Sequence, residues 1–247
     1  MTYHIASVSW GKDSLAMLLK LIEIGSPLNQ VVFFDTGMEF PAIYDTRDRA
    51  LPLLDKHHIL YTELHPKNPM WWTMFCRHVR EKEPQKKPNP MNVAFAKAGM
   101  QPDGIHYGYG WCGGSCRWGT SEKNRALDKY AKDRSAIVYI GIAADEKNRL
   151  NKDIEPYKRH PLALWGMTEA DCLEYCYDNG FFWEQDGVML YDILDRVSCW
   201  CCRNKNQTEL KAIHDHLPDY WQRLVAMESV LGQMKTKPLE EIGGNHE

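Results

Sequence analysis

The sequence contains no long apolar run, and this absence excludes a helix that could span a membrane. The longest apolar stretches, such as the one from Val31 to Phe34, fall far short of the roughly 20 residues that cross a bilayer. The chain also has no basic segment followed by an apolar one at its start, so we expect no secretory signal, no membrane partner and a cytoplasmic location. Internal repeats and low-complexity tracts are absent as well.

Neither sign of charge predominates, because the formal net charge of the 247 residues is only −3 at pH 7. Such a balance creates no positive field over the whole chain, so nucleic-acid binding would need a local basic patch. The chain does contain eight cysteines. In a protein without an export signal, cysteines indicate free thiols or metal ligands rather than a scaffold of disulfides.

Short apolar segments and amphipathic segments alternate at the start of the chain. We expect three strands and two helices in alternation, at 3–9, 12–24, 31–34, 41–57 and 59–64. This order predicts an α/β fold with a doubly wound, mostly parallel sheet. Ligands of such sheets bind at the carboxyl ends of the strands, which is where the loop at 9–14 and Asp35 fall.

From residue 65 to about residue 120 this alternation fails and prolines accumulate. A long irregular insertion in a compact domain is typically a lid or a binding segment, so we expect it to face the substrate, with a short helix around 91–98. Beyond it we expect further helices and one strand, at 122–133, 136–141, 168–179, 206–216 and 219–234. The sequence thus predicts a domain at 1–205 that carries the insertion, and a helical C-terminal extension at 206–247.

A polar turn joins the first strand to the first helix, and its residues are Ser9, Trp10, Gly11, Lys12, Asp13 and Ser14. The first N–H groups of a helix have no partners within it, so such a turn forms a cradle for an anion. Lys12 adds a positive charge, and the hydroxyls of Ser9 and Ser14 add donors. The turn is not a Walker A loop, because Ala6 and Asp13 stand where that motif needs Gly and Ser or Thr. A polar turn without a ligand is the alternative, but the pattern favours binding of an adenine nucleotide by its phosphates.

The same six residues resemble the PP-loop, S-x-G-K-D-S, of ATP pyrophosphatases and sulfonucleotide reductases. Together with two later segments, they make the chain similar to the phosphoadenosine phosphosulfate (PAPS) reductase family of PP-loop proteins. The resemblance runs from about Ser9 to Cys202 except for residues 65–110 of the insertion, and it implies a Rossmann-like fold of the adenine nucleotide α-hydrolase type. It also implies that the loop holds the phosphates of ATP or of a sulfonucleotide, with Lys12 and Asp13 acting in catalysis.

The first of the later segments, from Asp35 to Pro41, is similar to a D-T-G-x-x-F-P stretch of sulfonucleotide reductases that lies against the nucleotide. The resemblance therefore implies that Asp35, Thr36 and Gly37 contact the nucleotide. Glu39 has no counterpart in the family. Because Mg²⁺ prefers carboxylate and phosphate oxygens, we expect Glu39 to hold Mg²⁺ near the phosphates. Taken alone, a turn at Gly37 explains the segment equally well.

The second segment, residues 141–149, is similar to a G-x-R-x-D-E-S-x-x-R stretch of the same family. Asp145, Glu146 and Arg149 match it. The resemblance implies that they bind the nucleotide, with the arginine gripping a phosphate or sulfate. The first arginine and the serine of the pattern are missing here, which weakens the case for a sulfonucleotide in particular. A solvated loop with ordinary charges is the alternative.

Five cysteines lie in two clusters, Cys112 and Cys116 in the insertion and Cys199, Cys201 and Cys202 further on. Thiolates from two such clusters can hold zinc or an iron–sulfur cluster, and spacing alone does not choose between them. The layout resembles adenylyl-sulfate reductases, whose adjacent cysteine pair and later C-x-x-C motif bind a [4Fe–4S] cluster. The resemblance implies Cys112, Cys116, Cys199 and Cys202 as ligands and favours [4Fe–4S] over Zn²⁺, although the first pair is C-x-x-x-C here. Cys201 is an alternative ligand, and buried free thiols are the alternative to any metal.

These patterns are compatible with three functions. The first is an ATP-pyrophosphatase-type enzyme that adenylates an acceptor, releases pyrophosphate and lets a sulfur donor displace AMP. Related PP-loop proteins thiolate tRNA or put sulfur into the DNA backbone, so a sulfur donor protein and a nucleic-acid acceptor are candidate partners. The second is an adenylyl-sulfate or PAPS reductase, which ranks lower because no cysteine follows Cys202 to act as the expected nucleophile. The third is a nucleotide-binding regulator without turnover.

Overall fold

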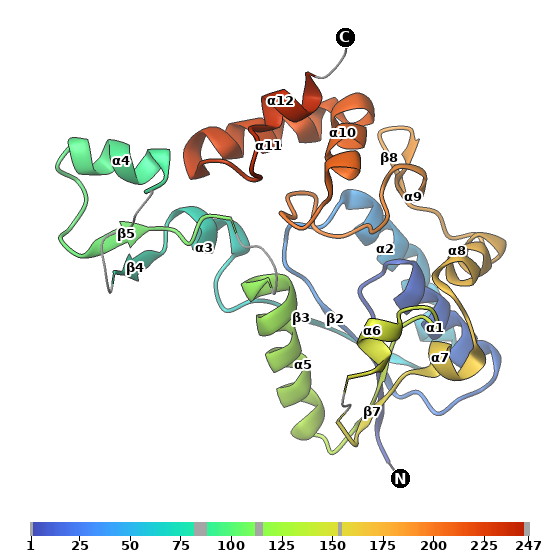
Figure 1. The fold of residues 1–247 in the computed structure, drawn as a ribbon. Helices are drawn as coiled ribbons and strands as arrows, with labels where there is room; N and C mark the ends of the chain where they lie inside the picture. The colour runs from blue at the N-terminus through green and yellow to red at the C-terminus, as the bar shows by residue number, and fades with distance from the viewer. Residues whose placement is uncertain (1, 82–87, 112–115, 153–154, 245–247) are drawn as a thin grey trace.

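The centre of the computed structural model, which describes residues 2–81, 88–111, 116–152 and 155–244, is a parallel five-stranded sheet (Figure 1). The strand order is β3-β2-β1-β6-β7. The strands are β1 (His4–Ser7), β2 (Gln30–Phe34), β3 (Leu60–Leu64), β6 (Ile137–Ile140) and β7 (Lys158–Arg159). The α/β fold and the parallel sheet that the sequence predicts are therefore confirmed.

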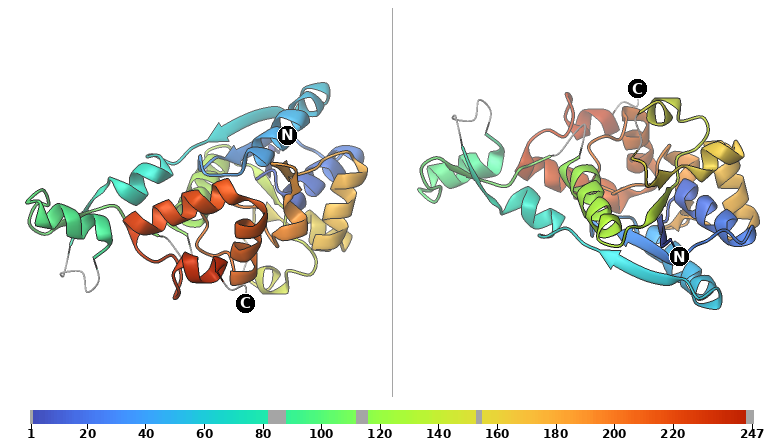
Figure 2. Two further views of the ribbon diagram at one scale, coloured as in Figure 1. Left: turned by 90° about the horizontal axis from the view of Figure 1, so that it is seen from above. Right: turned by 90° about the horizontal axis from the view of Figure 1, so that it is seen from below.

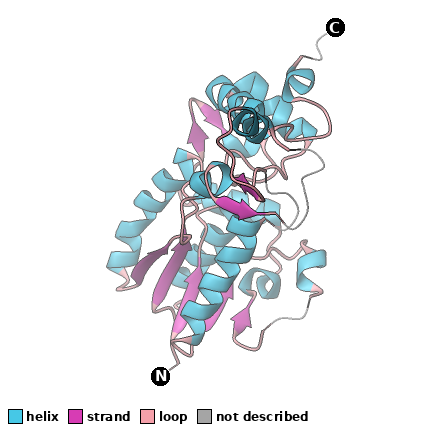
Figure 3. Ribbon diagram, turned by 90° about the vertical axis from the view of Figure 1, so that its left-hand side faces the viewer, coloured by secondary structure: helices cyan, strands magenta, loops and turns pink. Residues whose placement is uncertain are grey.

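Helices lie on both faces of this sheet (Figure 3). Those of the main domain are α1 (Lys12–Glu23), α2 (Pro41–Lys56), α5 (Lys123–Lys132), α6 (Lys147–Leu150), α7 (Pro161–Trp165), α8 (Glu169–Asp178) and α9 (Leu190–Ile193). Leu127 of α5 packs on Ile5 of β1, whereas α1 and α2 share a core with Ala6. Because side chains alternate along a strand, these neighbouring β1 residues face opposite layers.

The helices differ in whether a side chain caps their first turn. Capping boxes close the starts of α8 and α10, where Thr168 pairs with Asp171 and Asn206 with Glu209. By contrast, α1 begins after Gly11, which offers no side-chain cap. The start of α1 therefore receives no side-chain cap from its own N-cap residue, and it lies at the carboxyl end of β1, in the middle of the sheet.

The expectation that residues 65–121 are irregular apart from one short helix is wrong in part. This stretch contains α3 (Met70–Phe75), β4 (His78–Arg80), α4 (Pro90–Lys97), β5 (Ile105–Tyr107) and most of a π-helical turn, η1 (Arg117–Glu122). β4 and β5 pair in antiparallel fashion, and with α3 and α4 they form an arm that projects to one side of the body (Figures 1 and 2). Strands of three residues are too short to produce a periodic sequence pattern.

The predicted C-terminal extension consists of helices as far as it is described. They are α10 (Gln207–His216), α11 (Pro218–Leu231) and α12 (Leu239–Gly243). The extension packs against the main domain through Phe40 and Tyr220, whose rings lie 4.9 Å apart, and Trp111 donates a hydrogen bond of 2.7 Å to the carbonyl of Gly232. The domain boundary at residue 205 stays a prediction. None of the described helices has the length and apolar character needed to cross a membrane.

Candidate functional site

The turn between β1 and α1 is anchored in the core by Trp10. Its backbone adopts a φ of 61°, which is costly for a residue with a side chain. The indole is fully buried and lies 6.4 Å from the ring of Phe33 and 5.8 Å from that of Tyr61. The Trp10 side chain therefore points away from any ligand, and a contribution of Trp10 to nucleotide binding is restricted to its backbone.

Two residues that are distant in the sequence form hydrogen bonds to the backbone of this turn. The indole N–H of Trp183 donates to the carbonyl of Trp10 at 2.7 Å, and the Tyr191 hydroxyl accepts from the N–H of Lys12 at 2.9 Å. A Cβ on Gly11 would lie 3.2 Å from that hydroxyl, so only glycine lets Tyr191 approach without crowding. The turn is thus fixed in shape before any ligand arrives.

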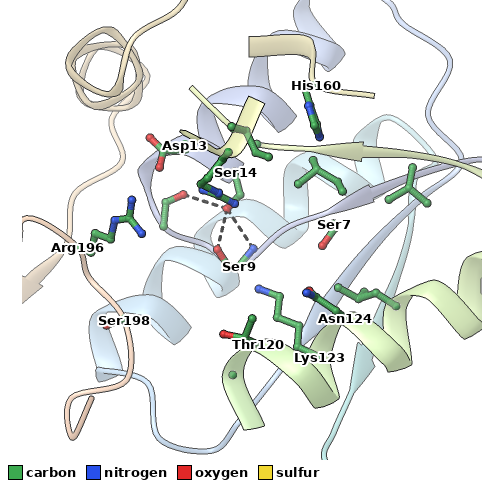
Figure 4. Close-up of a pocket in the computed structure, with 18 of the residues that line it drawn as sticks. Ser7, Ser9, Asp13, Ser14, Thr120, Lys123, Asn124, His160, Arg196 and Ser198 are labelled. Carbon is green, nitrogen blue, oxygen red and sulfur yellow. Dashed lines mark hydrogen bonds between the residues drawn. The ribbon is translucent and has the colours of Figure 1, made fainter. Parts of the chain in front are cut away.

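The serines of the turn close it from the inside. Ser14 Oγ accepts from the N–H of Ser9 at 3.0 Å and donates to the carbonyl of Gly11 at 3.1 Å, and it lies 3.2 Å from Ser9 Oγ (Figure 4). A Cβ on Gly141, after β6, would lie 2.8 Å from the Ser14 Cα. Glycine at 141 therefore allows the start of α1 to pack closely against the carboxyl end of β6.

Lys12 is the buried cation of the turn. Its Nζ lies 3.0 Å from Asp13 Oδ1 and 2.5 Å from Glu169 Oε2, and its side chain is 8% exposed. Burial opposes the charge, but Asp13 and Glu169 outweigh it and raise the pKa of Lys12, so the ammonium persists. Burial raises the pKa of Asp13 despite the contact with Lys12.

A cavity of about 670 Å³ opens in front of the turn. Apolar side chains of α5 and the sheet form part of its wall, including Leu127, Val138 and Ile140. Its cationic lining residues are Lys12, Lys123, Arg149, Lys152, Lys158 and Arg196, and its acidic ones are Asp13, Asp128, Glu155 and Asp195. Lys158 is paired with Asp128 at 2.8 Å. Figure 4 shows Lys123 of α5 and Arg196 on different sides of the turn, so basic side chains reach the cavity from separate elements.

The predicted nucleotide contacts after β2 lie elsewhere. Asp35, Thr36, Gly37 and Glu39 are absent from the lining of the cavity. Asp35 Oδ1 accepts from the Tyr44 hydroxyl at 2.7 Å and from the Gly37 N–H at 2.8 Å. Thr36 Oγ1 donates to Glu39 Oε1 at 3.0 Å. The geometry around the turn therefore gives no support for Mg²⁺ at Glu39, and this role stays a prediction.

Glu39 instead faces the cysteines. Its Oε1 lies 3.5 Å from Cys199 Sγ, and burial raises its pKa. Lys123 lies close to both groups: burial lowers the pKa of Lys123, and Glu39 and Cys199 oppose that shift. Lys123 also lines the cavity, so it belongs both to the cavity wall and to the surroundings of Glu39 and Cys199.

Of the three predicted residues after β6, only Arg149 lines the cavity. The Asp145 carboxylate accepts from the backbone N–H of Glu169 at 3.1 and 3.3 Å, at the start of α8. Glu146 Oε1 accepts from Arg149 at 2.8 Å and from Arg196 at 3.0 Å. Asp145 and Glu146 thus position Glu169 and the two arginines, and direct contact of these acids with a nucleotide stays a prediction.

Cys199, Cys201 and Cys202 lie on one tight turn, here called the cysteine loop (residues 198–202), in which the Cys202 N–H donates to the Cys199 carbonyl at 3.0 Å. Cys116 caps η1, where its Sγ accepts from the N–H of Gly119 at 3.4 Å. Cys112 lies outside the described residues. Within the described ranges, no three His, Cys, Asp or Glu side chains converge as a preformed metal site. The four-cysteine ligand set therefore stays a prediction.

Lys205 gives an independent indication of what the cysteine loop can hold. Its side chain is 2% exposed, and its Nζ has no hydrogen-bond partner in the described part of the chain. Burial lowers its pKa, while Glu209 and the three cysteines of the loop raise it. A buried ammonium is costly unless negative charge lies near it; Glu209 supplies some of this charge, and metal-bound thiolates would add to it. The residues of the loop therefore fit a thiolate-bound metal centre.

Sequence reasoning did not identify Lys123, Glu169, Tyr191 or Arg196 as site residues. Glu169 and Tyr191 reach Lys12 across 157 and 179 residues of chain, and no local pattern signals such contacts. Lys123 had a weak signal, since it opens the helix that follows the first cysteine cluster.

The comparison with family models agrees with the resemblance drawn from the motifs. The family model of the phosphoadenosine phosphosulfate reductase domain matches residues 3–93. No curated protein matches the chain. Among the solved structures similar to it is the U34-tRNA thiolase NcsA from Methanococcus maripaludis with its [4Fe–4S] cluster. It is 13% identical, with a TM-score of 0.44 over 99% of this chain and 80% of that chain.

Proposed function

We propose, from the premise that residues 3–93 belong to the phosphoadenosine phosphosulfate reductase domain family, that the chain is an ATP-dependent adenylating enzyme. It activates an acceptor with ATP and then exchanges AMP for sulfur. Both the adenylation step and the sulfur step are parts of this proposal.

The observation that carries the proposal is the pre-shaped turn at 9–14 in front of a cavity of about 670 Å³. This volume lies within the range of small-molecule sites. The polyphosphate of ATP would lie at the start of α1, in a cavity that Lys12, Lys123, Arg149 and Arg196 also line. The apolar wall of α5 and the sheet suits a nucleobase.

In the first step, an acceptor oxygen attacks the α-phosphorus of ATP, forming an O–P bond as the bond to the β-phosphate oxygen breaks. Pyrophosphate carries the released negative charge. Lys12 and the N–H groups at the start of α1 neutralise this charge, which lowers the barrier. In the second step, the sulfur of a donor bonds to the activated acceptor atom, and AMP leaves with the acceptor oxygen.

Two inorganic groups fit this scheme. Asp13 is one of four carboxylates that line the cavity and belongs to the turn itself, so it would share Mg²⁺ with the phosphates. Cys116, Cys199 and Cys202, with Cys201 as the alternative, would hold a [4Fe–4S] cluster or Zn²⁺ together with Cys112. A cluster there would supply a site that holds the sulfur to be transferred. The cysteine loop begins at Ser198, which lines the cavity, so the two sites adjoin.

A sulfonucleotide reductase is the second candidate, and the match to the reductase domain favours it. In that reaction the same cavity would take adenylyl sulfate or its 3′-phosphate, and sulfite would be released. The two candidates differ in substrate and product, so one set of assays separates them.

The test uses the full chain purified without oxygen. ATP is supplied with bulk tRNA, with DNA or without acceptor, and pyrophosphate is measured; adenylyl sulfate and PAPS are supplied in parallel, and sulfite is measured. Acceptor-dependent pyrophosphate release supports adenylation. Sulfite release instead supports the reductase, and binding of ATP without turnover of any nucleotide supports a regulator. Broad visible absorbance of the purified protein distinguishes a cluster from zinc.

A further inference from the structure

Tyr191 reaches the phosphate-binding turn from a distant part of the chain. It belongs to α9, which follows the hairpin of β8 (Glu184–Gln185) and β9 (Val188–Met189). Its ring stands edge-on to Trp183 at 4.9 Å, and Lys12 Nζ lies 5.8 Å from the ring centre. These contacts fix the position of the hydroxyl against the backbone of the turn.

The hydroxyl occupies a donor that an anion would otherwise use. The N–H of Lys12, the first residue of α1, donates to Tyr191 Oη at 2.9 Å. A phenol both accepts and donates hydrogen bonds. Among the described residues no acceptor takes the O–H of Tyr191, and Tyr191 lines the cavity. The turn therefore presents an O–H donor to the cavity in place of the Lys12 N–H.

We propose that the Tyr191 hydroxyl is a ligand of the pyrophosphate portion of the bound nucleotide. It accepts a hydrogen bond from the Lys12 N–H and donates its own proton to a phosphate oxygen. The inference rests on the proposed function, because it takes ATP as the ligand. A chain of two donors in series polarises the outer one, which suits a charged phosphate oxygen.

Two further observations agree with this role. Burial raises the pKa of Tyr191 well above its usual value, so the hydroxyl keeps its proton at neutral pH. Gly11 leaves room for the hydroxyl, since a Cβ there would lie only 3.2 Å from it. The φ of Gly11 is −82°, which alanine also adopts, so Gly11→Ala would press on Tyr191 without straining the backbone.

The matched control is Tyr177. Its ring also packs against Trp183, at 6.5 Å, and its buried hydroxyl has no hydrogen-bond partner in the described ranges. Tyr177→Phe thus removes the same atom from the same aromatic group without touching the turn. Isothermal titration of both variants and the parent uses ATP, pyrophosphate and adenosine as ligands.

We expect Tyr191→Phe to weaken ATP and pyrophosphate binding by about tenfold and to leave adenosine binding unchanged. Tyr177→Phe should bind all three ligands as the parent does. Equal loss of adenosine and ATP in Tyr191→Phe would make Tyr191 a purely structural residue. Unchanged or tighter ATP binding, the latter marking the hydroxyl as a competitor of the phosphate, would also overturn the inference. A parent protein that binds neither ATP nor pyrophosphate would instead refute the proposed function.

A second variant, Gly11→Ala in the parent protein, tests the same contact without changing Tyr191, and the double mutant with Tyr191→Phe completes a cycle. Gly11→Ala should weaken pyrophosphate binding in the parent, because its Cβ displaces the hydroxyl. In the Tyr191→Phe background the same change should cost little further affinity, since the displaced atom is gone. Additive losses in this double-mutant cycle would contradict the role of Tyr191.

Discussion

Lys12 Nζ and Glu169 Oε2 lie 2.5 Å apart, although 157 residues separate them in the chain. Glu169 is the first residue of α8, and its backbone N–H is held by Asp145. The cation that is expected to grip the nucleotide phosphates is thus already neutralised by an acid from a neighbouring helix. A phosphate that enters the cavity has to compete with Glu169 for Lys12.

Glu169→Gln should therefore strengthen ATP binding. The glutamine keeps the size of the side chain but removes the charge that competes with the phosphate, and we expect roughly threefold to tenfold tighter binding. Isothermal titration at constant ionic strength measures the effect. Glu174→Gln, an exposed position on the same helix, should bind ATP as the parent does. Weaker binding by Glu169→Gln would mean that Glu169 positions Lys12 rather than competing for it.

Lys12→Met should abolish most of the ATP affinity. It removes a buried ammonium whose side chain is 8% exposed and leaves Asp13 and Glu169 unopposed beside the phosphates. Loss of a charge-assisted contact in such a setting predicts at least about tenfold weaker binding. Lys20→Met is the control, because Lys20 lies on the same helix and pairs with Glu23 at 2.9 Å away from the cavity. Equal affinities for Lys12→Met and the parent would remove the turn from the site.

Lys12 could be predicted from the sequence as a site residue, whereas its partners Glu169 and Tyr191 could not. The turn at 9–14 is local: an apolar strand, a glycine and an amphipathic helix follow one another, so its position and its anion-binding character are readable from the residues. Glu169 and Tyr191 are invisible at that level, because only the packing of α8 and α9 against α1 brings them to Lys12. Contacts of this kind depend on the whole fold.

The arm shows a second limit. Its strands β4 and β5 have three residues each, which is less than two periods of alternation, so prolines and charges dominated the sequence pattern. The helix at Pro90–Lys97 was predictable because Asn89 caps it and Pro90 opens it. The segment at Asp35–Gly37 matched a family motif, yet its hydrogen bonds turn it toward Tyr44 and the cysteine loop. A motif fixes residue types but not where side chains point.

The capping box of α8 makes a prediction about pH. The Thr168 side chain and backbone donate to Asp171, and these hydrogen bonds lower the pKa of Asp171. Thr168→Ala should cost about 1 kcal/mol of unfolding free energy at neutral pH. Because the folded-state pKa of Asp171 lies below the unfolded value, the contribution of the pair is present above that value and is lost as the pH falls through the folded pKa. The cost of Thr168→Ala should therefore shrink below about pH 4.

Urea unfolding at pH 7 and pH 3 measures this difference. Thr208→Ala, an exposed threonine in the first turn of α10 with no hydrogen bond of its own among the described contacts, should be neutral at both values. A cost for Thr168→Ala that is the same at both pH values would mean that Asp171 does not contribute through its charge.

Lys205→Met should have opposite effects on the metal-free and the metal-bound forms of the cysteine loop. In the metal-free protein the buried ammonium lacks a hydrogen-bond partner among the described residues, so its replacement by an apolar side chain of similar length should stabilise the fold by roughly 1–3 kcal/mol. Burial lowers the pKa of Lys205 in the folded state, so the unfolded chain binds more protons on the alkaline side. The advantage of Lys205→Met should therefore shrink as the pH rises toward the usual lysine pKa.

When the cysteines bind metal as thiolates, we expect Lys205→Met to be destabilising instead, because the Lys205 ammonium then offsets their negative charge. Lys205→Met should retain less iron or zinc after anaerobic reconstitution, although its metal-free form melts at a higher temperature than the parent. Lys211→Met, on the exposed face of α10 where Lys211 pairs with Asp215 at 3.0 Å, should change neither quantity in this way. A Lys205→Met protein that gains stability and still binds metal as tightly as the parent would show that the lysine charge does not serve the cysteine loop. Lower stability of the metal-free variant would mean that the ammonium already has a partner in the folded chain.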